Sequence, residues 1–346
     1  MRKSVILLLI LVMMVTPVRA AEYTAPEVPE DASWLMEAPS NSFSEGLLNI
    51  LKKAIPVLYP VFAEAMRTCL AVICAVLAVS VMDNFSIANQ KTISMASTVL
   101  VGLILLHCTD TMISLGADTV AEISEYGKLF LPVITAATAA QGGVGTSAAL
   151  YAGTAFFDSL LSSVISKLLI PTLYIYLCLC IAAGALGEQV LHKLKGLAKQ
   201  GITWVCKTVL YVFTGYLSIT GVVSGTTDAA ALKAAKLAIS GCIPVVGSIL
   251  SDASESILVS AGIMKNAAGI YGILAFIAIS ILPFLKISVY YLLFKVTAAI
   301  CEVFGNKEST GLIKDFSTGF GFLLAMTGTV CLLFLISTVC FMKGVH

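Results

Sequence analysis

The sequence has few charged residues for its length. Of its 346 residues, 12% are Asp, Glu, Lys or Arg, whereas 58% are hydrophobic. A soluble globular domain cannot bury such a large apolar share. The 21 Lys and Arg are scattered and nearly balanced by 20 acidic residues, so the chain lacks the clustered basic face that nucleic-acid binding requires. The composition therefore predicts a membrane protein that does not bind nucleic acid.

Histidine is also scarce, with three residues in the whole chain. The stretch "HCTD" at 107–110 has no partner motif that would complete a metal site. Ten cysteines are present, and nearly all lie in or beside apolar runs, as small hydrophobic residues do in membranes. Paired aspartates or a Ser-His set at a plausible spacing are missing from the apolar runs. The sequence therefore predicts no catalytic residues, no metal site and no cofactor.

The N-terminus has the pattern of a secretory signal. Arg2 and Lys3 precede an apolar stretch over 5–15, and Val18-Arg19-Ala20 resembles a cleavage site. We expect a signal peptide over 1–20, cut after Ala20. An uncleaved anchor helix of similar length would give the same orientation, with the following residues outside the cytoplasm.

Residues 21–66 predict an extracytoplasmic linker followed by an amphipathic helix. Ser42 and Glu45 have the spacing of a capping box at a helix start. One face of this helix carries the apolar residues Phe43, Leu47, Ile50, Leu51 and Ile55. Binding to a membrane surface and packing against protein both explain that face.

Long apolar runs make up most of the remaining chain, and most are close to the roughly 20 residues that span a bilayer. They lie at 68–82, 92–108, 168–186, 203–224, 267–304 and 319–340. Two shorter or polar-interrupted pieces, 129–140 and 242–263, are interpreted as broken or re-entrant segments packed inside protein. The fold class is thus an all-α polytopic membrane protein with six to eight membrane segments.

Loop charges predict the orientation. The segment 187–200 carries Lys193, Lys195 and Lys199, and short Lys-rich loops favour the cytoplasm. We expect these lysines to dock a cytoplasmic partner. The acidic segment 109–127 has no Lys or Arg and is interpreted as an outside loop.

Four prolines suggest an internal duplication. Pro132 and Pro171 are separated by as many residues as Pro244 and Pro283, and each is expected to end or bend a helix. "GLAKQ" at 196 and "GLIKD" at 311 follow at a similar offset, which would make the copies parallel. Low residue identity leaves chance as an alternative.

These patterns divide the chain as follows. The expected parts are a signal peptide over 1–20, a linker and amphipathic helix over 21–66, first membrane helices and an acidic loop over 67–127, a first repeat over 128–224, a connecting segment over 225–239, and a second repeat with the C-terminal span over 240–346.

The stretch "SGCIPVVGSILSDASESILVSAG" at 240–262 is unusually polar for this chain. As a helix it places Ser248, Asp252 and Glu255 on one face. A carboxylate at membrane depth usually faces a bundle interior or water. We therefore hypothesise a broken helix over 243–262 whose polar face lines a conduit or subunit contact. A solvated surface helix in an extracytoplasmic loop remains the alternative.

A longer run carries a family resemblance. Residues 214–262, "TGYLSITGVVSGTTDAAALKAAKLAISGCIPVVGSILSDASESILVSAG", closely resemble the stage III sporulation protein AE family of endospore-forming bacteria. The resemblance implies a subunit of a channel or feeding complex in the mother-cell membrane around the forespore. It also implies other stage III A-operon products as partners, including a cytoplasmic ATPase, and leaves a homo-oligomer open. No catalytic residues are implied.

Two functions therefore compete. The resemblance favours a non-enzymatic membrane subunit of an export or channel complex. The repeat and the intramembrane charges Lys207, Lys286 and Lys295 would also suit a permease for a small solute. An intramembrane hydrolase finds no support.

Overall fold

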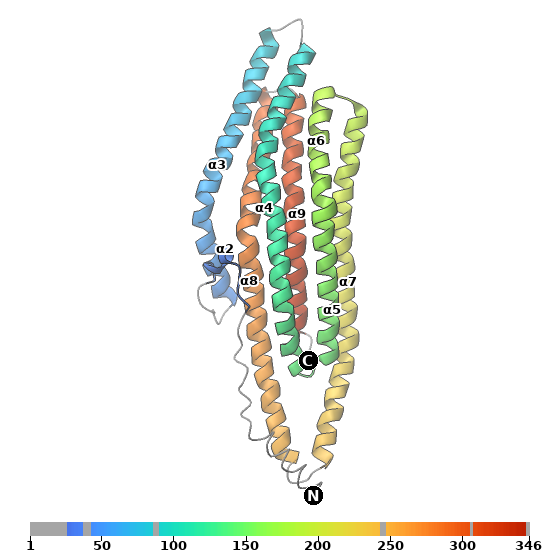
Figure 1. Cartoon of the computed structure of the whole chain (residues 1–346). Helices are drawn as coiled ribbons and strands as arrows, with labels where there is room; N and C mark the ends of the chain where they lie inside the picture. Colours follow the sequence, from blue (N-terminus) through green and yellow to red (C-terminus); the bar gives the residue numbers. More distant parts are fainter. Residues whose placement is uncertain (1–25, 37–42, 86–89, 243–246, 305–306, 344–346) are drawn as a thin grey trace.

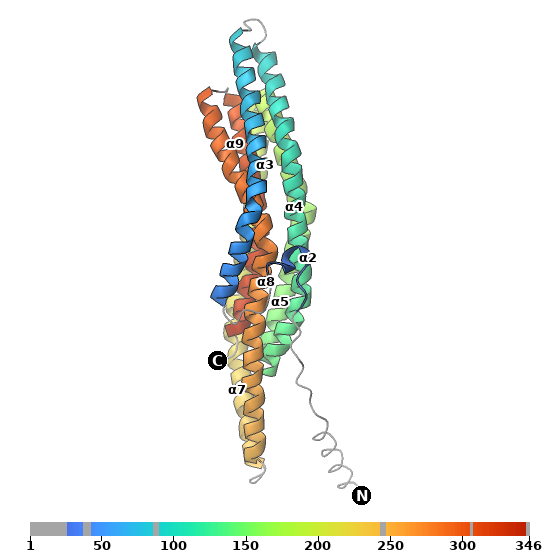
Figure 2. The ribbon, with the colours of Figure 1, turned by 90° about the vertical axis from the view of Figure 1, so that its left-hand side faces the viewer.

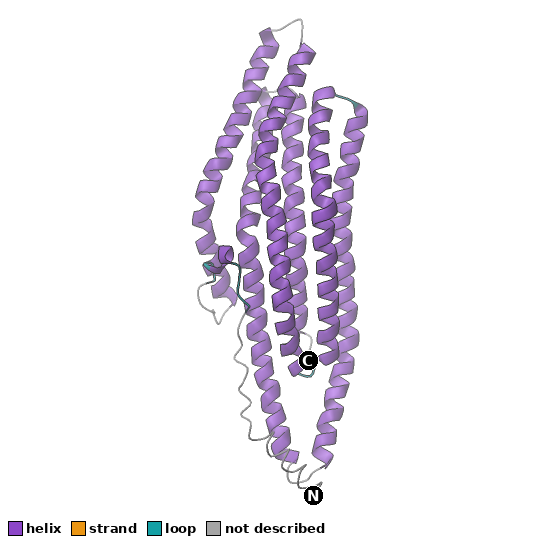
Figure 3. Cartoon of the chain, viewed as in Figure 1, coloured by secondary structure: helices purple, strands orange, loops and turns teal. Residues whose placement is uncertain are grey.

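The computed structural model describes residues 26–36, 43–85, 90–242, 247–304 and 307–343, and between residues 218 and 261 it describes at most the backbone. Within these ranges every regular element is helical and no strand occurs (Figure 3). The helices are α2 (Glu30–Ser33), α3 (Phe43–Phe85), α4 (Gln90–Ala140), α5 (Val144–Val164), a π-helical turn η1 (Ile165–Leu169), α6 (Ile170–Leu186), α7 (Gln189–Cys242), α8 (Gly247–Phe304) and α9 (Lys307–Lys343).

The long helices run along one common axis and form an elongated bundle (Figure 1). Helix α9 lies at its centre and packs against α4, α5, α6, α7 and α8. Helix α3 packs on α4 and α8 at one edge, and α7 forms the other edge. The last turns of α7 and the first turns of α8 extend beyond the ends of α4, α5 and α9 (Figure 2).

Aromatic side chains join the three central helices. Phe276 of α8 stacks on Phe334 of α9 with 4.7 Å between ring centroids, and it meets Tyr126 and Phe130 of α4 edge-on. All four rings are fully buried. Edge-to-face and offset arrangements of this kind add to the stabilisation from apolar burial, so this cluster fixes α4, α8 and α9 relative to one another.

Two glycines make the described turns between long helices. Gly142 takes a φ of 94° after α4, and Gly187 takes a φ of 68° after α6. Only glycine adopts the left-handed region without steric cost. The Gly187 amide donates to the Ala183 carbonyl, which ends α6 and lets α7 return along it.

The predicted fold class is confirmed, since five helical stretches of the described chain are long and apolar enough to cross a membrane. They are Phe43–Val81, Ser94–Ala140, Val144–Leu186, Lys265–Val303 and Lys307–Lys343. Each is much longer than the roughly 20 residues that a bilayer requires. Helix α4, with 51 residues, is about 76 Å long at 1.5 Å per residue, so parts of the bundle lie outside the hydrocarbon layer.

Several predicted segment boundaries are wrong. The acidic segment 109–127 is no loop but the middle of α4, and 129–140 is its last part rather than a separate re-entrant piece. The reason is amphipathicity: Asp110, Asp118 and Glu125 lie on one exposed face of α4, while apolar residues fill the other. The connecting segment 225–239 is likewise part of α7.

The amphipathic helix expected to end by residue 66 also continues, because α3 runs without interruption from Phe43 to Phe85. The predicted signal peptide over 1–20 and the capping residue Ser42 lie outside the described residues.

Each proline was expected to end or bend a helix; Pro132 and Pro283 end none, and a bend at these residues stays a prediction. Pro132 and Pro283 lie inside α4 and α8, which continue through them. A proline removes one backbone hydrogen bond from the helix. Inside a bundle, groups of the neighbouring helices can satisfy the freed backbone carbonyl, so the helix continues. Pro171 is the second residue of α6, which continues from the π-helical turn η1, so α5 and α6 form one locally widened helix. Pro244 lies outside the described residues.

The duplication stays a prediction. Its proposed boundaries at 128 and 240 fall inside α4 and α7. The structure places Pro171 and Pro283 in the first helix of two successive antiparallel pairs, α6 with α7 and α8 with α9. Gly196 and Gly311 lie near the starts of the second helices, at the same end of the bundle (Figure 1).

Candidate functional site

The end of the bundle where α7 and α9 begin carries an ion pair. Lys195 Nζ of α7 lies 2.6 Å from Asp315 Oδ2 of α9, and both side chains are about one-fifth exposed. The Tyr176 hydroxyl of α6 donates to the Asp315 carbonyl oxygen at 3.2 Å. One residue of α9 therefore connects three helices at this end.

A polar cavity of about 310 Å³ lies beside this ion pair, between the end of α6 and the starts of α7 and α9. It contains basic and acidic groups in nearly equal number, His192, Lys195 and Lys307 against Glu308 and Asp315. Small residues, Ala183, Gly184, Gly187 and Gly311, complete much of the wall. With opposite charges already adjacent, the cavity has no strong preference for an anion or a cation.

The three predicted docking lysines differ in their surroundings. Lys193 and Lys199 are exposed on the first turns of α7, and neither forms an ion pair with another described residue. Lys195 is partly buried and bound to Asp315. Lys193 and Lys199 are thus surface charges, whereas Lys195 connects α7 to α9 within the bundle.

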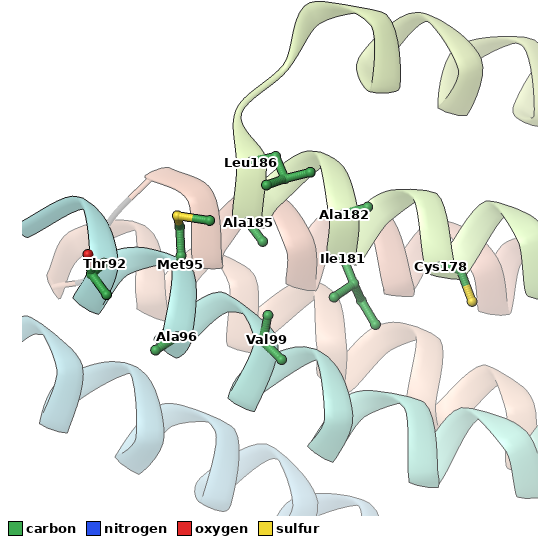
Figure 4. Close-up of a pocket in the computed structure, with 9 residues that line it drawn as sticks. All are labelled: Thr92, Met95, Ala96, Val99, Cys178, Ile181, Ala182, Ala185 and Leu186. Atoms are coloured by element: carbon green, nitrogen blue, oxygen red, sulfur yellow. The ribbon is translucent and has the colours of Figure 1, made fainter.

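An apolar groove of about 760 Å³ opens at the same end, between the first turns of α4 and the last turns of α6 (Figure 4). Met95, Ala96 and Val99 of α4 face Ile181 and Ala185 of α6 across it (Figure 4). Its lining includes hardly any polar surface, so it offers nothing that would orient a polar ligand. Lipid chains or apolar side chains suit its walls.

Deeper in the bundle, polar side chains connect α5 to its neighbours. Ser124 Oγ of α4 donates to Asp158 Oδ2 of α5 at 2.7 Å. One helical turn earlier on α5, the hydroxyl of Thr154 is hydrogen-bonded to that of Ser337 on α9. All four residues are buried.

Sequence reasoning missed these four residues. The available signal was the aspartate in "FFDSLL", an acidic residue between apolar ones, which in a membrane helix usually marks a functional position. Thr154 and Asp158 are four apart, so they share one face of a helix. Their partners on α4 and α9 could not be read from spacing.

The predicted polar face of Ser248, Asp252 and Glu255 falls on residues whose side chains the structure does not describe. Their backbone belongs to α8, one continuous helix from Gly247 to Phe304. Residues 247–262 are therefore not a separate broken or re-entrant helix. These turns lie where α8 extends past α4, α5 and α9 (Figure 1).

The described residues hold no group of three or more His, Cys, Asp or Glu side chains that would bind a metal ion. The sites found are ion pairs, hydroxyl contacts and surface charges. Such an arrangement suits interhelical connection, partner binding or movement of protons and ions.

Comparison with known proteins assigns the family. The family model described as stage III sporulation protein AE matches residues 37–344, nearly the whole chain. The stage III sporulation protein AE of Bacillus subtilis (strain 168) is 22% identical over 253 residues. The match covers 72% of this chain and 63% of that relative, so it spans less than two thirds of the relative's length. No solved structure matches. The chain belongs to the stage III sporulation protein AE family.

Proposed function

We propose that this protein is a non-enzymatic multispanning membrane subunit of a channel or secretion-like complex that connects the mother cell and the forespore. It would reside in the mother-cell membrane around the forespore and support forespore development. The family match over residues 37–344 carries this proposal. The apolar helices support the membrane location.

The shape of the bundle fits such a subunit. Helices of 37 to 58 residues are much longer than a bilayer of about 30 Å requires. Both ends of the bundle can therefore meet other proteins. By the excess of lysine, the end with Lys193 and Lys199 faces the cytoplasm. The extended turns of α7 and α8 then face the space between the two membranes.

Each end has candidate contact residues. Lys193 and Lys199 would bind an acidic surface of a cytoplasmic partner, such as the complex's ATPase or a protein associated with it. At the opposite end, Ser248, Asp252 and Glu255 would line a conduit or a subunit contact. The other partners would be further stage III A-operon products. A homo-oligomer of this chain would fit the same role.

A permease for a small solute is the second candidate. Asp158 and Lys265, each 3% exposed, favour it, because buried ionisable groups in membrane segments often belong to ion or proton pathways. Both residues lie in candidate membrane spans. Solute uptake by the purified protein alone in liposomes would support the permease, whereas activity only together with partner proteins would support the complex subunit.

The test is to delete the gene in the spore-forming host and to replace it with genes for variant proteins. Without the gene, we expect engulfed forespores that fail to express late genes. The double variant Lys193→Gln and Lys199→Gln should accumulate normally yet recover less of a cytoplasmic partner on affinity purification. Lys128→Gln is the control, because Lys128 is equally exposed but lies on α4 away from this end. Normal sporulation without the gene would overturn the proposal.

A further inference from the structure

Asp158 is an acidic side chain enclosed in the bundle. It lies on α5 within a candidate membrane span and is 3% exposed. Ser124 Oγ of α4 donates to its Oδ2 at 2.7 Å. Its Oδ1 is buried and has no hydrogen-bond partner among the described residues. An ionised carboxylate here would leave one charged oxygen without compensation.

Among the described residues, Lys128 of α4 is the positive side chain that acts on this carboxylate, and burial of Asp158 outweighs its influence. On α4, Lys128 is one turn from Ser124 but exposed, and it forms no ion pair with Asp158. The other ionisable residues near this part of α4 are Glu122 and Glu125, both acidic, and Tyr126, whose ring lies in the aromatic cluster.

On the other two helices packed on α5, α9 and α7, the described side chains add no compensating charge. Helix α9 carries no Asp, Glu, Lys, Arg or His between Asp315 and Lys343, although Cys331 and Cys340 lie there. On α7, Lys207 and Tyr211 are exposed on the outside of the bundle. Cys206 is buried, and the ring of Tyr216 packs on Phe157 while its hydroxyl donates to the Ala149 carbonyl, so neither supplies a positive charge.

We propose that Asp158 is a proton-binding site, neutral while α5 is packed against α4 and α9, and that it releases its proton to water when this contact opens. A proton on Oδ2 would let the carboxyl group donate to Ser124 Oγ. The serine hydroxyl could then donate to the helix carbonyl four residues earlier. Thr119 and Thr138 on the same helix make this type of bond, at 2.6 Å and 2.8 Å.

Proton binding would be coupled to helix packing. The ionised form is favoured by water and the neutral form by the closed interior. Ser124 on one side and the bond between Thr154 and Ser337 on the other hold α5 in place. Loss of the proton would therefore favour separation of α5 from α4 and α9, and separation would favour loss of the proton.

Infrared difference spectroscopy of the full-length protein tests the protonation state directly. At neutral pH, the spectrum of the wild type minus that of Asp158→Asn should contain the carbonyl band of a protonated carboxylic acid. The band should disappear at alkaline pH. The matched control is Asp118→Asn, which replaces an exposed aspartate of α4; its difference spectrum should contain carboxylate bands at neutral pH. Carboxylate bands for Asp158 at neutral pH would overturn the proposal.

Two further measurements keep the test decisive. If the Asp158 bands are those of a carboxylate and shift when sodium replaces potassium, the site binds a cation and the proton assignment is wrong. If Asp158→Asn does not fold, wild-type protein is treated with dicyclohexylcarbodiimide. The carboxyl proton passes to a carbodiimide nitrogen, the carboxyl oxygen adds to the central carbon, and the adduct rearranges to a stable N-acylurea.

Mass spectrometry then locates the N-acylurea. We expect it on Asp158 and not on the exposed Asp118 or Glu125, with labelling that declines as the pH rises. Labelling of Asp118 and Glu125 without labelling of Asp158 would contradict the proposal. These outcomes do not depend on sporulation, so they are independent of the proposed role in the complex.

Discussion

Lys195, near the start of α7, and Asp315, near the start of α9, form an ion pair with 2.6 Å between Nζ and Oδ2. They belong to or adjoin the segments "GLAKQ" and "GLIKD", which the sequence pattern matched to one another. The contact joins the first turns of two helices that begin 118 residues apart (307 − 189). It also removes one lysine from the surface that was predicted to dock a partner.

Breaking this ion pair should destabilise the bundle. Lys195→Gln leaves the Asp315 carboxylate four-fifths buried beside the cavity without its cation, and we expect a loss of about 1 kcal/mol, between the values for exposed and buried pairs. Thermal unfolding of detergent-purified protein measures the loss. Exchange of the two residues, Lys195→Asp with Asp315→Lys, should restore part of it.

The control is the ion pair between Lys314 and Glu302, at 2.9 Å, whose side chains are more than half exposed. Lys314→Gln should change stability by less than about 0.5 kcal/mol. Equal losses in Lys195→Gln and Lys314→Gln would show that partial burial is not the cause.

The aromatic cluster predicts a second stability effect. A Cβ atom on Gly127 of α4 would lie 2.1 Å from the ring of Phe334 on α9, so Gly127→Ala must displace a fully buried ring. We expect a loss of about 1 to 3 kcal/mol, as for other overpacked cores. Thermal unfolding of the purified variant is the measurement.

Gly196→Ala is the matched control, because a Cβ atom there meets nothing within 4 Å. It should leave stability unchanged or raise it by up to about 1 kcal/mol, since alanine favours the helix. If the Gly127→Ala protein were as stable as the Gly196→Ala protein, α4 and α9 would not pack as closely at Gly127 as the structure shows.

The sequence predicted the class of fold because apolar content dominates every long run. It did not predict the helix lengths. A count of charged residues along the sequence cannot distinguish a loop from a helix that carries its charges on one face. Asp110, Asp118 and Glu125 made the middle of α4 look like an outside loop, yet they occupy one exposed face of a continuous helix. Hydropathy windows cannot distinguish these cases.

The interior contacts of the candidate site were beyond the sequence for a different reason. Ser124 and Asp158 are 34 residues apart, and Thr154 and Ser337 are separated by 183. Such pairs depend on which helix faces pack together, which no local pattern specifies. The lysine signal at 193 and 199 is local and could be read from the sequence, and the structure shows both residues exposed; their docking role stays a prediction.

Labelling of engineered cysteines should place the two ends of the bundle on opposite sides of the membrane. In a cysteine-free background, Lys199→Cys should react with an impermeant reagent only after the cells are opened. In cells that produce the protein without sporulating, Val144→Cys, an exposed position at the turn between α4 and α5, should react while the cells are intact. Lys199 is preferred to Lys195 because Lys195 is paired with Asp315, whereas Lys199 forms no ion pair with another described residue.

Each of these two positions is the control for the other, because both are exposed but they lie at opposite ends of the bundle. Reaction at both positions in intact cells would contradict a membrane-crossing bundle. Reaction at residue 199 alone would reverse the orientation.

The first turns of α8 provide the last prediction. Ser248, Asp252 and Glu255 share one face by sequence spacing, and the backbone that carries them extends beyond α4, α5 and α9 (Figure 1). If this face lines a conduit or binds another subunit, Asp252→Asn with Glu255→Gln should lower spore yield while the protein still accumulates in the membrane. Removal of two charges without a change of size weakens a polar contact but leaves a helix intact.

Asp118→Asn is the comparison variant, because it removes an exposed carboxylate from α4 instead. Loss of the doubly substituted protein from the membrane would indicate a role in folding. Unchanged spore yield in both variants would mean that Asp252 and Glu255 only keep an exposed helix solvated. A defect in the double variant alone, at normal protein level, would assign function to the extended end of α8, the end opposite to Lys193 and Lys199.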